Sequence, residues 1–390
     1  MSLHYKFGGS TAGRTIQCPA WTNLSKNMPS GPTSLAALTG TLGHLLFERG
    51  IEDEEFEPGA MLGESRIIDG TTLVVDEVIV DKVYTALEVM DAVAQKWNLK
   101  YVLPEVIMST DDDTGGTADI IGYDSRTDPV EVFAVGDLKT GDGHMVYAEN
   151  NEQLLFYAWQ AVERFKGELT FYDETTVLLF IIQPSDRRDD PLDEWTCSIK
   201  DVLAYGELFK QKQKEAKAGQ TKPCPGKHCA YCPAMSTCPA KTGMVAESLR
   251  IPAKSRELDD LIKALAVVDE AEEWCRAVRK MGYEQAEAGV ELPGFKLVHK
   301  RATRKWKDDT SAMAPFKNSP KFKIEDYMEM KPKSPAQMEK VCKTKSVDFK
   351  RYESSIEAVS SGTTLVKATD KRPAVLPLKA LGALAARIKK

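Results

Sequence analysis

The sequence lacks any apolar segment long enough to cross a membrane. Its longest uninterrupted apolar run is 177–182, whereas a membrane-spanning helix needs about 20 mainly apolar residues. The N-terminal residues also lack an apolar stretch followed by a small-residue cleavage site, which is the pattern of a secretory signal. We therefore expect a protein that stays in the cytoplasm and has no membrane partner.

An internal repeat and an even distribution of charge are also missing. Residues 1–294 carry 29 basic against 48 acidic side chains, whereas residues 295–390 carry 23 against 10. The length favours two domains, which we expect at 1–244 and 245–390, the second helical and then basic. A basic segment can lie along nucleic acid phosphates or against the acidic part of its own chain, and composition does not separate the two.

Cysteine, by contrast, is present in a pattern. Cytosolic thiols are kept reduced, so the eight cysteines do not predict a disulfide framework. The spacing C-x2-C-x5-C at Cys229, Cys232 and Cys238 favours a metal centre, with Cys18 far upstream as a fourth ligand. Cys224 could replace Cys18. Such a centre would join the N-terminus to the end of the preceding domain, and structural Zn²⁺ suits four thiolates.

Hydrophobic periodicity predicts an α/β fold. Helical spacing of apolar residues alternates with short runs rich in β-branched residues that are separated by turn-formers. We expect a three-stranded antiparallel meander, a crossover helix and a further parallel strand, which together form a mixed sheet flanked by helices. The predicted helices are 34–48, 76–97, 148–165, 199–218 and 258–287, and the predicted strands are 100–108, 117–123, 131–138 and 175–183.

Two acidic residues and a lysine come together on the predicted meander. Alternate side chains of a strand point the same way, so Asp137 and Lys139 should share one face, and Asp119 should meet Asp137 across the hairpin. Neighbouring carboxylates repel unless a cation lies between them, and Mg²⁺ prefers oxygen ligands. Hydrolysis of a phosphodiester needs an activated water and neutralisation of extra negative charge. A metal ion and an ammonium group would supply both.

The order of these groups along the chain resembles the PD-(D/E)xK nuclease superfamily. His44, Glu105, Gly116-Thr-Ala-Asp119 and Asp137-Leu-Lys139 follow one another, and a helix with Gln153 and Tyr157 comes next. The resemblance covers about residues 34–160 and is specifically to the RecB-like exonuclease branch. It implies a restriction-endonuclease-like core. It implies Mg²⁺ or Mn²⁺ at the active site and DNA as the substrate.

The resemblance also implies roles for single residues. The metal ligands would be His44, Asp119, Asp137 and the carbonyl of Leu138, while Lys139 would activate or orient water. Glu105 occupies the place of a further acidic group whose role varies among relatives. The Q-x-x-x-Y pair Gln153 and Tyr157 would position the DNA or support the site. For His44 and Tyr157, simple packing in the core is the alternative.

The cysteine pattern is similar to that of the iron–sulfur nucleases of the AddB type and the CRISPR-associated adaptation nucleases. In these enzymes one N-terminal cysteine joins three that follow the catalytic core. The resemblance implies a 4Fe–4S cluster on Cys18, Cys229, Cys232 and Cys238, with structural Zn²⁺ as the alternative.

Two further segments complete the prediction. The segment 8–15 fits a phosphate-binding loop, but Arg14 replaces the required lysine and no strand precedes it, so we expect a flexible segment leading to Cys18. The basic segment 293–306 and two later segments resemble the C-terminal half of a phage- and prophage-associated domain family. This resemblance implies a phage-encoded protein of DNA recombination in a bacterial host, with a recombination or single-strand-binding protein as partner. The alternative is a non-catalytic DNA-binding or assembly protein that retains the nuclease fold.

Overall fold

The chain forms two compact units, residues 1–301 and 302–390. The computed structural model describes residues 5–28, 34–141, 144–185, 187, 189–219, 221–248, 258–287, 289–295, 342, 348 and 350. Nearly all of these belong to the first unit. The domain boundary predicted between residues 244 and 245 falls within helix α7 (Pro239–Ser248) and so inside the first unit. The basic stretches predicted after residue 295 lie outside the described residues.

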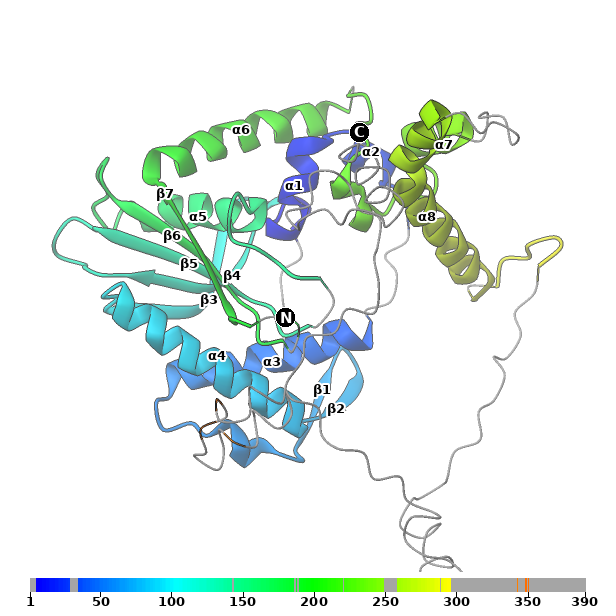
Figure 1. Cartoon of the computed structure of the whole chain (residues 1–390). Helices are drawn as coiled ribbons and strands as arrows, with labels where there is room; N and C mark the ends of the chain where they lie inside the picture. Colours follow the sequence, from blue (N-terminus) through cyan, green and yellow to red (C-terminus); the bar gives the residue numbers. More distant parts are fainter. Residues whose placement is uncertain are drawn as a thin grey trace, which may run out of the picture. The chain divides into compact units, whose positions relative to one another are not determined.

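A five-stranded mixed sheet forms the centre of the first unit (Figure 1). Its strand order follows the sequence, and all neighbouring strands are antiparallel except β5 and β6, which are parallel. A parallel pair needs a crossover, and helix α5 provides it. The predicted meander and parallel strand are confirmed, but β7 was not predicted. The strands are β3 (Tyr101–Asp111), β4 (Thr114–Tyr123), β5 (Val132–Leu138), β6 (Thr176–Ile182) and β7 (Leu192–Ser198).

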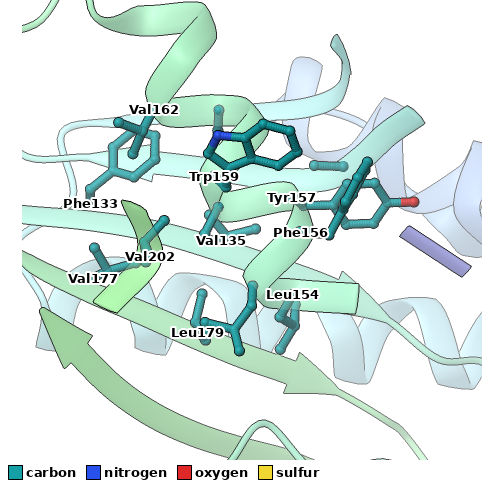
Figure 2. Packing of buried hydrophobic residues seen from close by; sticks show 14 of the residues in the cluster. Phe133, Val135, Leu154, Phe156, Tyr157, Trp159, Val162, Val177, Leu179 and Val202 are labelled. Carbon is teal, nitrogen blue, oxygen red and sulfur yellow. The ribbon is translucent and has the colours of Figure 1, made fainter. Parts of the chain in front are cut away.

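Helices cover both faces of the sheet, as expected of a restriction-endonuclease-like core. Because side chains alternate along a strand, Val135 packs on one face and Ala134 on the other. The first face contacts α5 (Glu152–Phe165) and α6 (Ile199–Ala218), where aromatic side chains of α5 dominate (Figure 2). The opposite face contacts α3 (Leu35–Glu52) and α4 (Glu77–Lys96) through Phe47 and Met90. The core therefore has three layers, helix, sheet and helix.

Side-chain caps define where these helices begin. Ser34 and Asp76 accept hydrogen bonds from the backbone N–H groups of Ala37 and Ile79, at the start of α3 and α4. Asn151 caps α5 in the same way, so this helix begins at Glu152 rather than at the predicted residue 148. The C-terminal end of α6 is set by Gly219, whose backbone has the left-handed conformation.

The segment expected to be flexible before Cys18 is instead helix α1 (Gly9–Gln17). The prediction was wrong because glycine here permits close packing rather than flexibility. A Cβ atom on Gly9 would lie 2.4 Å from Cζ of Tyr157, and one on Gly13 would lie 2.6 Å from Oε2 of Glu152. The missing side chains thus let α1 lie directly against α5. Thr11 caps the helix by accepting from the N–H of Gly8.

Smaller elements complete the first unit. In the part of the chain that the structure describes, no helix combines the length and apolar character needed to span a bilayer. The predicted acidic helix is confirmed as α8 (Leu258–Glu287), which packs against α7. The remaining elements are α2 (Trp21–Leu24), η1 (Pro58–Met61), the hairpin of β1 (Ser65–Ile68) and β2 (Thr71–Val74), and η2 (Lys227–Tyr231).

Candidate functional site

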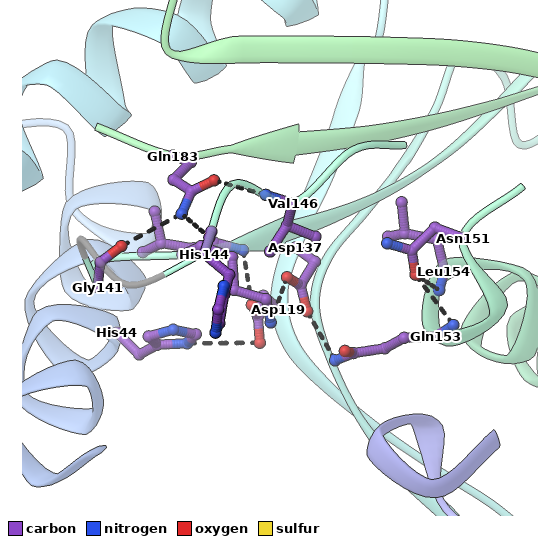
Figure 3. A network of polar contacts seen from close by, with 12 residues as sticks. His44, Asp119, Asp137, Gly141, His144, Val146, Asn151, Gln153, Leu154 and Gln183 are labelled. Atoms are coloured by element: carbon purple, nitrogen blue, oxygen red, sulfur yellow. Dashed lines mark hydrogen bonds and ion pairs between the residues drawn. The ribbon is translucent and has the colours of Figure 1, made fainter. Parts of the chain in front are cut away.

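Polar and charged side chains from four elements meet where the end of β5 lies beside the middle of β4 (Figure 3). Strand β4 provides Asp119, and the end of β5 provides Asp137 and Lys139. Helix α3 brings His44 to the same place, and Glu105 comes from β3. The sequence pattern thus brings together residues that are up to 95 positions apart.

Three of these side chains form a set that can hold a divalent cation. One ligand atom each from His44, Glu105 and Asp119 lies within 4.8 Å of the other two. Nδ1 of His44 is 3.4 Å from Oδ1 of Asp119 and 3.6 Å from Oε1 of Glu105. All three residues are partly buried, which limits competition from water. Two carboxylates and an imidazole match the ligand types of Mn²⁺ and similar ions.

The backbone at Glu105 has an unusual conformation. Its φ angle is +47°, which is rare for a residue with a side chain and costs on the order of 1–2 kcal/mol. The register of β3 and β4 pairs Pro104 with Ile120 and Val106 with Ala118, which places Glu105 opposite Asp119. The unfavourable angle is therefore found at the residue whose carboxylate completes the three-residue set.

Asp119 is held in place from two sides. Its Oδ2 accepts a hydrogen bond of 2.8 Å from the backbone N–H of Leu138, and its Oδ1 faces His44. Burial alone would raise the pKa of Asp119, but His44, Lys139 and this N–H group lower it below its usual value. Burial alone would lower the pKa of His44, but Asp119 and Glu105 outweigh it and raise that pKa to about 10. The carboxylates therefore attract positive charge to this point.

Asp137 lies beside the three-residue set and contacts a different pair of groups. Its Oδ2 is 2.6 Å from Nζ of Lys139, and its Oδ1 accepts a 2.8 Å hydrogen bond from Nε2 of Gln153. Burial raises the pKa of Asp137 to about 6, although Lys139 opposes the shift. Burial alone would lower the pKa of Lys139, yet Asp137 and Asp119 raise it above its ordinary value. Lys139 is therefore an ammonium group in this site.

Tyr157 lies one helical turn after Gln153 and is buried against α1 and β4. Its ring contacts the places where Cβ atoms of Gly9 and Gly116 would stand. Burial raises the pKa of its phenol, and the charges of Asp137 and Asp119 add to the effect. The phenol therefore stays protonated next to the carboxylates. Tyr157 therefore packs in the core, as the simpler interpretation expects, and its phenol lies within the electrostatic influence of Asp137 and Asp119.

Gln183 shapes the loop after Lys139 and was missed in the sequence. Its amide nitrogen donates to the carbonyl oxygens of Gly141 and His144, and its Oε1 accepts from the N–H of Val146 (Figure 3). Gln183 is almost completely buried. The sequence signal for Gln183 is its position as a polar residue directly after the apolar run 177–182. Its three hydrogen bonds hold Gly141, His144 and Val146 beside the candidate site.

The clustered cysteines and Cys18 line one cavity. Cys18, Cys229 and Cys238 are buried, Cys232 is half-buried and Cys224 is exposed. The backbone N–H of Cys224 donates to Sγ of Cys18 at 3.3 Å, and that of Gly226 donates to Sγ of Cys229 at 3.4 Å. The cavity lining consists of Arg14, Cys18, Trp21, Leu24, Pro223, Cys224, Pro225, His228, Cys229, Cys232, Met235, Cys238 and Lys241. The end of α1 and the segment after α6 thus meet at five cysteine residues.

The chain belongs to the family described as protein of unknown function DUF2800, whose pattern matches residues 4–373. The match covers both units. Among solved structures, the chain is similar to one from Eubacterium rectale that is named "Putative exonuclease". The two sequences are 14% identical, the match covers 58% of this chain and 86% of the other, and the TM-score is 0.31. At this identity and TM-score, the similarity does not extend to function.

Proposed function

We propose that this protein is a metal-dependent nuclease that hydrolyses phosphodiester bonds of DNA. The strongest support is that a candidate cation site and an ion pair lie next to each other. The candidate cation site consists of His44, Glu105 and Asp119, and the ion pair joins the ammonium of Lys139 to the carboxylate of Asp137. Phosphodiester hydrolysis needs both an activated water and neutralisation of the developing negative charge.

The acidic residues and His44 have the task of holding the metal. His44, Glu105 and Asp119 would bind a Mg²⁺ or Mn²⁺ ion, with Asp137 and the carbonyl of Leu138 as the further ligands implied by the resemblance. A divalent ion bound by these residues would polarise a phosphate oxygen and lower the pKa of water. The N–H of Leu138 orients the carboxylate of Asp119, since it holds one oxygen and leaves the other facing His44, where it would be available to the ion.

Lys139 acts as a positioned positive charge. Its side chain is 31% exposed, whereas that of Asp137 is 3% exposed, so the ammonium lies at the surface of the site and its partner lies beneath. The ammonium can orient the attacking water and neutralise a phosphate oxygen, since three N–H donors are available and Asp137 occupies one direction. Gln153 holds the other oxygen of Asp137, so the lysine has a fixed anchor.

The proposed substrate is DNA, and the proposed reaction is exonucleolytic. The resemblance to RecB-like exonucleases supports cleavage from ends, and the phage-associated resemblance supports DNA recombination in a bacterial cytoplasm. The proposed protein partner is a recombination or single-strand-binding protein. The acidic character of residues 1–294 makes a basic partner surface, or the basic residues after 295, useful for holding phosphates.

Cleavage of matched substrates tests this proposal. Linear duplex and single-stranded DNA, each with open and with blocked ends, would be incubated with purified full-length protein and Mn²⁺ or Mg²⁺. We expect shortening of the open substrates, little of the blocked ones, and none in the presence of EDTA. DNA binding without cleavage under either metal would contradict the proposal and favour a non-catalytic DNA-binding protein.

We propose that the cysteine cavity holds a 4Fe–4S cluster. N–H groups that donate to two sulfur atoms, as those of Cys224 and Gly226 do, are typical of thiolates that bind a cluster. Four thiolates would also hold a structural zinc ion, and the similarity of the cysteine pattern to the iron–sulfur nucleases favours a cluster over zinc.

Cys18 is the fourth ligand that we propose, rather than Cys224. Cys18 is buried in the cavity, whereas Cys224 is exposed and directs its backbone N–H toward the sulfur of Cys18. The Cys18→Ser variant should therefore lose iron and sulfide after anaerobic purification, while Cys224→Ser should keep both. A colourless wild-type protein that contains zinc would contradict the cluster, and loss of iron from the Cys224 variant alone would reverse the ligand assignment.

A further inference from the structure

Two cationic side chains border the cysteine cavity without a carboxylate partner among the described residues. Lys241 lies on α7 and Arg14 on α1, and both line the cavity together with the cysteines. Lys241 is only 1% exposed, and its Nζ has no hydrogen-bond acceptor among the described residues. A buried ammonium without a counter-charge costs several kcal/mol as a rule. Something in this cavity must therefore offset its charge.

Arg14 is fixed in place, but no acidic partner for it lines the cavity in the part of the chain that the structure describes. Its Nη2 donates to the carbonyl oxygen of Tyr231 at 2.7 Å, and its guanidinium lies 5.0 Å from the ring centre of Trp21. Its Nε is buried and without a hydrogen-bond partner in the described part of the chain. Neither contact neutralises its charge. Burial alone lowers the pKa of Arg14, and the thiolates of Cys232, Cys229 and Cys18 act in the opposite direction.

The charges of the cavity balance only with an anionic centre. Among the described residues that line the cavity there is no aspartate or glutamate, so the thiolates are the available anions. Four thiolates carry four negative charges, and a zinc ion or an oxidised 4Fe–4S core carries two positive ones. The net charge of such a centre is about −2, which the two cations of Arg14 and Lys241 neutralise.

We propose that Lys241 and Arg14 are the counter-charges of the cysteine centre. They are positioning residues that stabilise the bound centre and, for an iron–sulfur cluster, raise its reduction potential. The inference rests on the proposed cysteine centre and goes beyond its ligands, since it assigns a task to two residues that do not bind the metal. It also explains why α1 carries an arginine one turn before Cys18 and why a lysine is buried three residues after Cys238.

The variant Lys241→Met tests the inference in the full-length protein. It removes the charge but keeps a long apolar side chain, while Lys241→Arg keeps the charge. Lys214→Met, at an exposed position of α6, is the matched control. After anaerobic purification, the loss of iron or zinc to a chelator would be followed by absorbance and metal analysis. We expect Lys241→Met to lose its metal about 10–100-fold faster than wild type. Lys241→Arg should stay close to wild type, and the control should be unchanged.

Two further readouts do not depend on nuclease activity. If the loss of the charge weakens the reduced state about tenfold, the midpoint potential of a cluster falls by about 59 mV. In the metal-free state, Lys241→Met should be more stable than wild type, because the substitution then removes a buried charge that has no partner among the described residues. Its thermal unfolding should occur at a higher temperature than that of metal-free wild type.

The outcomes separate the inference from the proposed cysteine centre. Wild-type protein that binds neither iron nor zinc would overturn the centre and, with it, the task of Lys241. A wild-type centre together with an unchanged rate of metal loss in Lys241→Met would overturn the inference alone. A metal-free Lys241→Met protein that is less stable than metal-free wild type would also contradict it, because Lys241 would then have a partner within the protein.

Discussion

The side-chain amide of Gln153 donates a 2.8 Å hydrogen bond to the buried carboxylate of Asp137, which also binds Lys139 through its other oxygen. We therefore propose that Gln153 holds the carboxylate of Asp137, which anchors the lysine, rather than the DNA. We expect Gln153→Ala to lower the rate of DNA cleavage about 10–100-fold, as is usual for residues that orient active-site groups. Steady-state kinetics should show the loss mainly in kcat.

The control for this variant is Gln95→Ala, at an exposed position of α4. It should leave cleavage and thermal stability unchanged. A Gln153→Ala protein with a normal kcat and a raised KM would contradict the positioning role and favour direct contact with DNA.

The backbone angle of Glu105 gives a second prediction. Alanine and glycine both remove the carboxylate, but only glycine relieves a φ of +47°. We expect metal-free Glu105→Gly to be about 1 kcal/mol more stable than Glu105→Ala, with metal binding weakened in both. Chemical denaturation of the two variants measures this difference directly.

The variants Ile107→Gly and Ile107→Ala test whether the positive φ angle of Glu105 causes the difference. Ile107 is exposed in the same strand and is not among the residues with positive φ. Here glycine should be less stable than alanine by about 0.5–1 kcal/mol. The same order at both positions would mean that the backbone at Glu105 is not strained.

Gly136 gives a third prediction, because it precedes Asp137 and packs against an aromatic ring. A Cβ atom at this position would lie 2.3 Å from Cζ of Phe180, which is completely buried. We expect Gly136→Ala to lower the free energy of unfolding by about 1–3 kcal/mol through overpacking. Gly167→Ala, where a Cβ atom would meet nothing within 4 Å, should cause no such loss. Equal stability of the two variants, measured in urea, would show that the sheet can adjust at Gly136.

Metal binding gives a fourth prediction. A ligand present at 100 times its dissociation constant stabilises the folded protein by about 2.7 kcal/mol. Mn²⁺ should therefore raise the unfolding temperature of wild type. Asp119→Asn should lose most of this gain because the amide is a poor cation ligand, although it can still accept from the N–H of Leu138. An equal gain in both proteins would mean that the metal binds elsewhere.

Much of the fold could be predicted from the sequence because the local signals agree with the packing. The periodicity of 199–218 and 258–287 gave the exact bounds of α6 and α8, and Asp137 and Lys139 do meet on one face. Strand β7 was missed because its sequence, Leu-Asp-Glu-Trp-Thr-Cys-Ser, is too polar to stand out. It is stabilised by pairing with the apolar strand β6.

Other features depend on contacts that are far apart in the chain. The helical form of α1 follows from its packing against Tyr157 and Glu152, which local glycine content does not reveal. The hydrogen bonds of Gln183 join the end of β6 to the loop after β5, 37 to 42 positions away. The burial of Lys241 beside the cysteines is likewise a property of the folded chain.

The most direct test of the central claim is the rate of cleavage of an end-labelled linear DNA by wild type, Asp119→Asn and Lys139→Met in Mn²⁺. Circular dichroism would first show that all three proteins are folded to the same extent. We predict metal-dependent cleavage by wild type and a loss of about 100-fold or more in both variants. Asp119→Asn weakens binding of the metal ion and Lys139→Met removes the ammonium, and these are the two positive charges offered to the phosphate. Cleavage by Asp119→Asn at the wild-type rate would contradict the account.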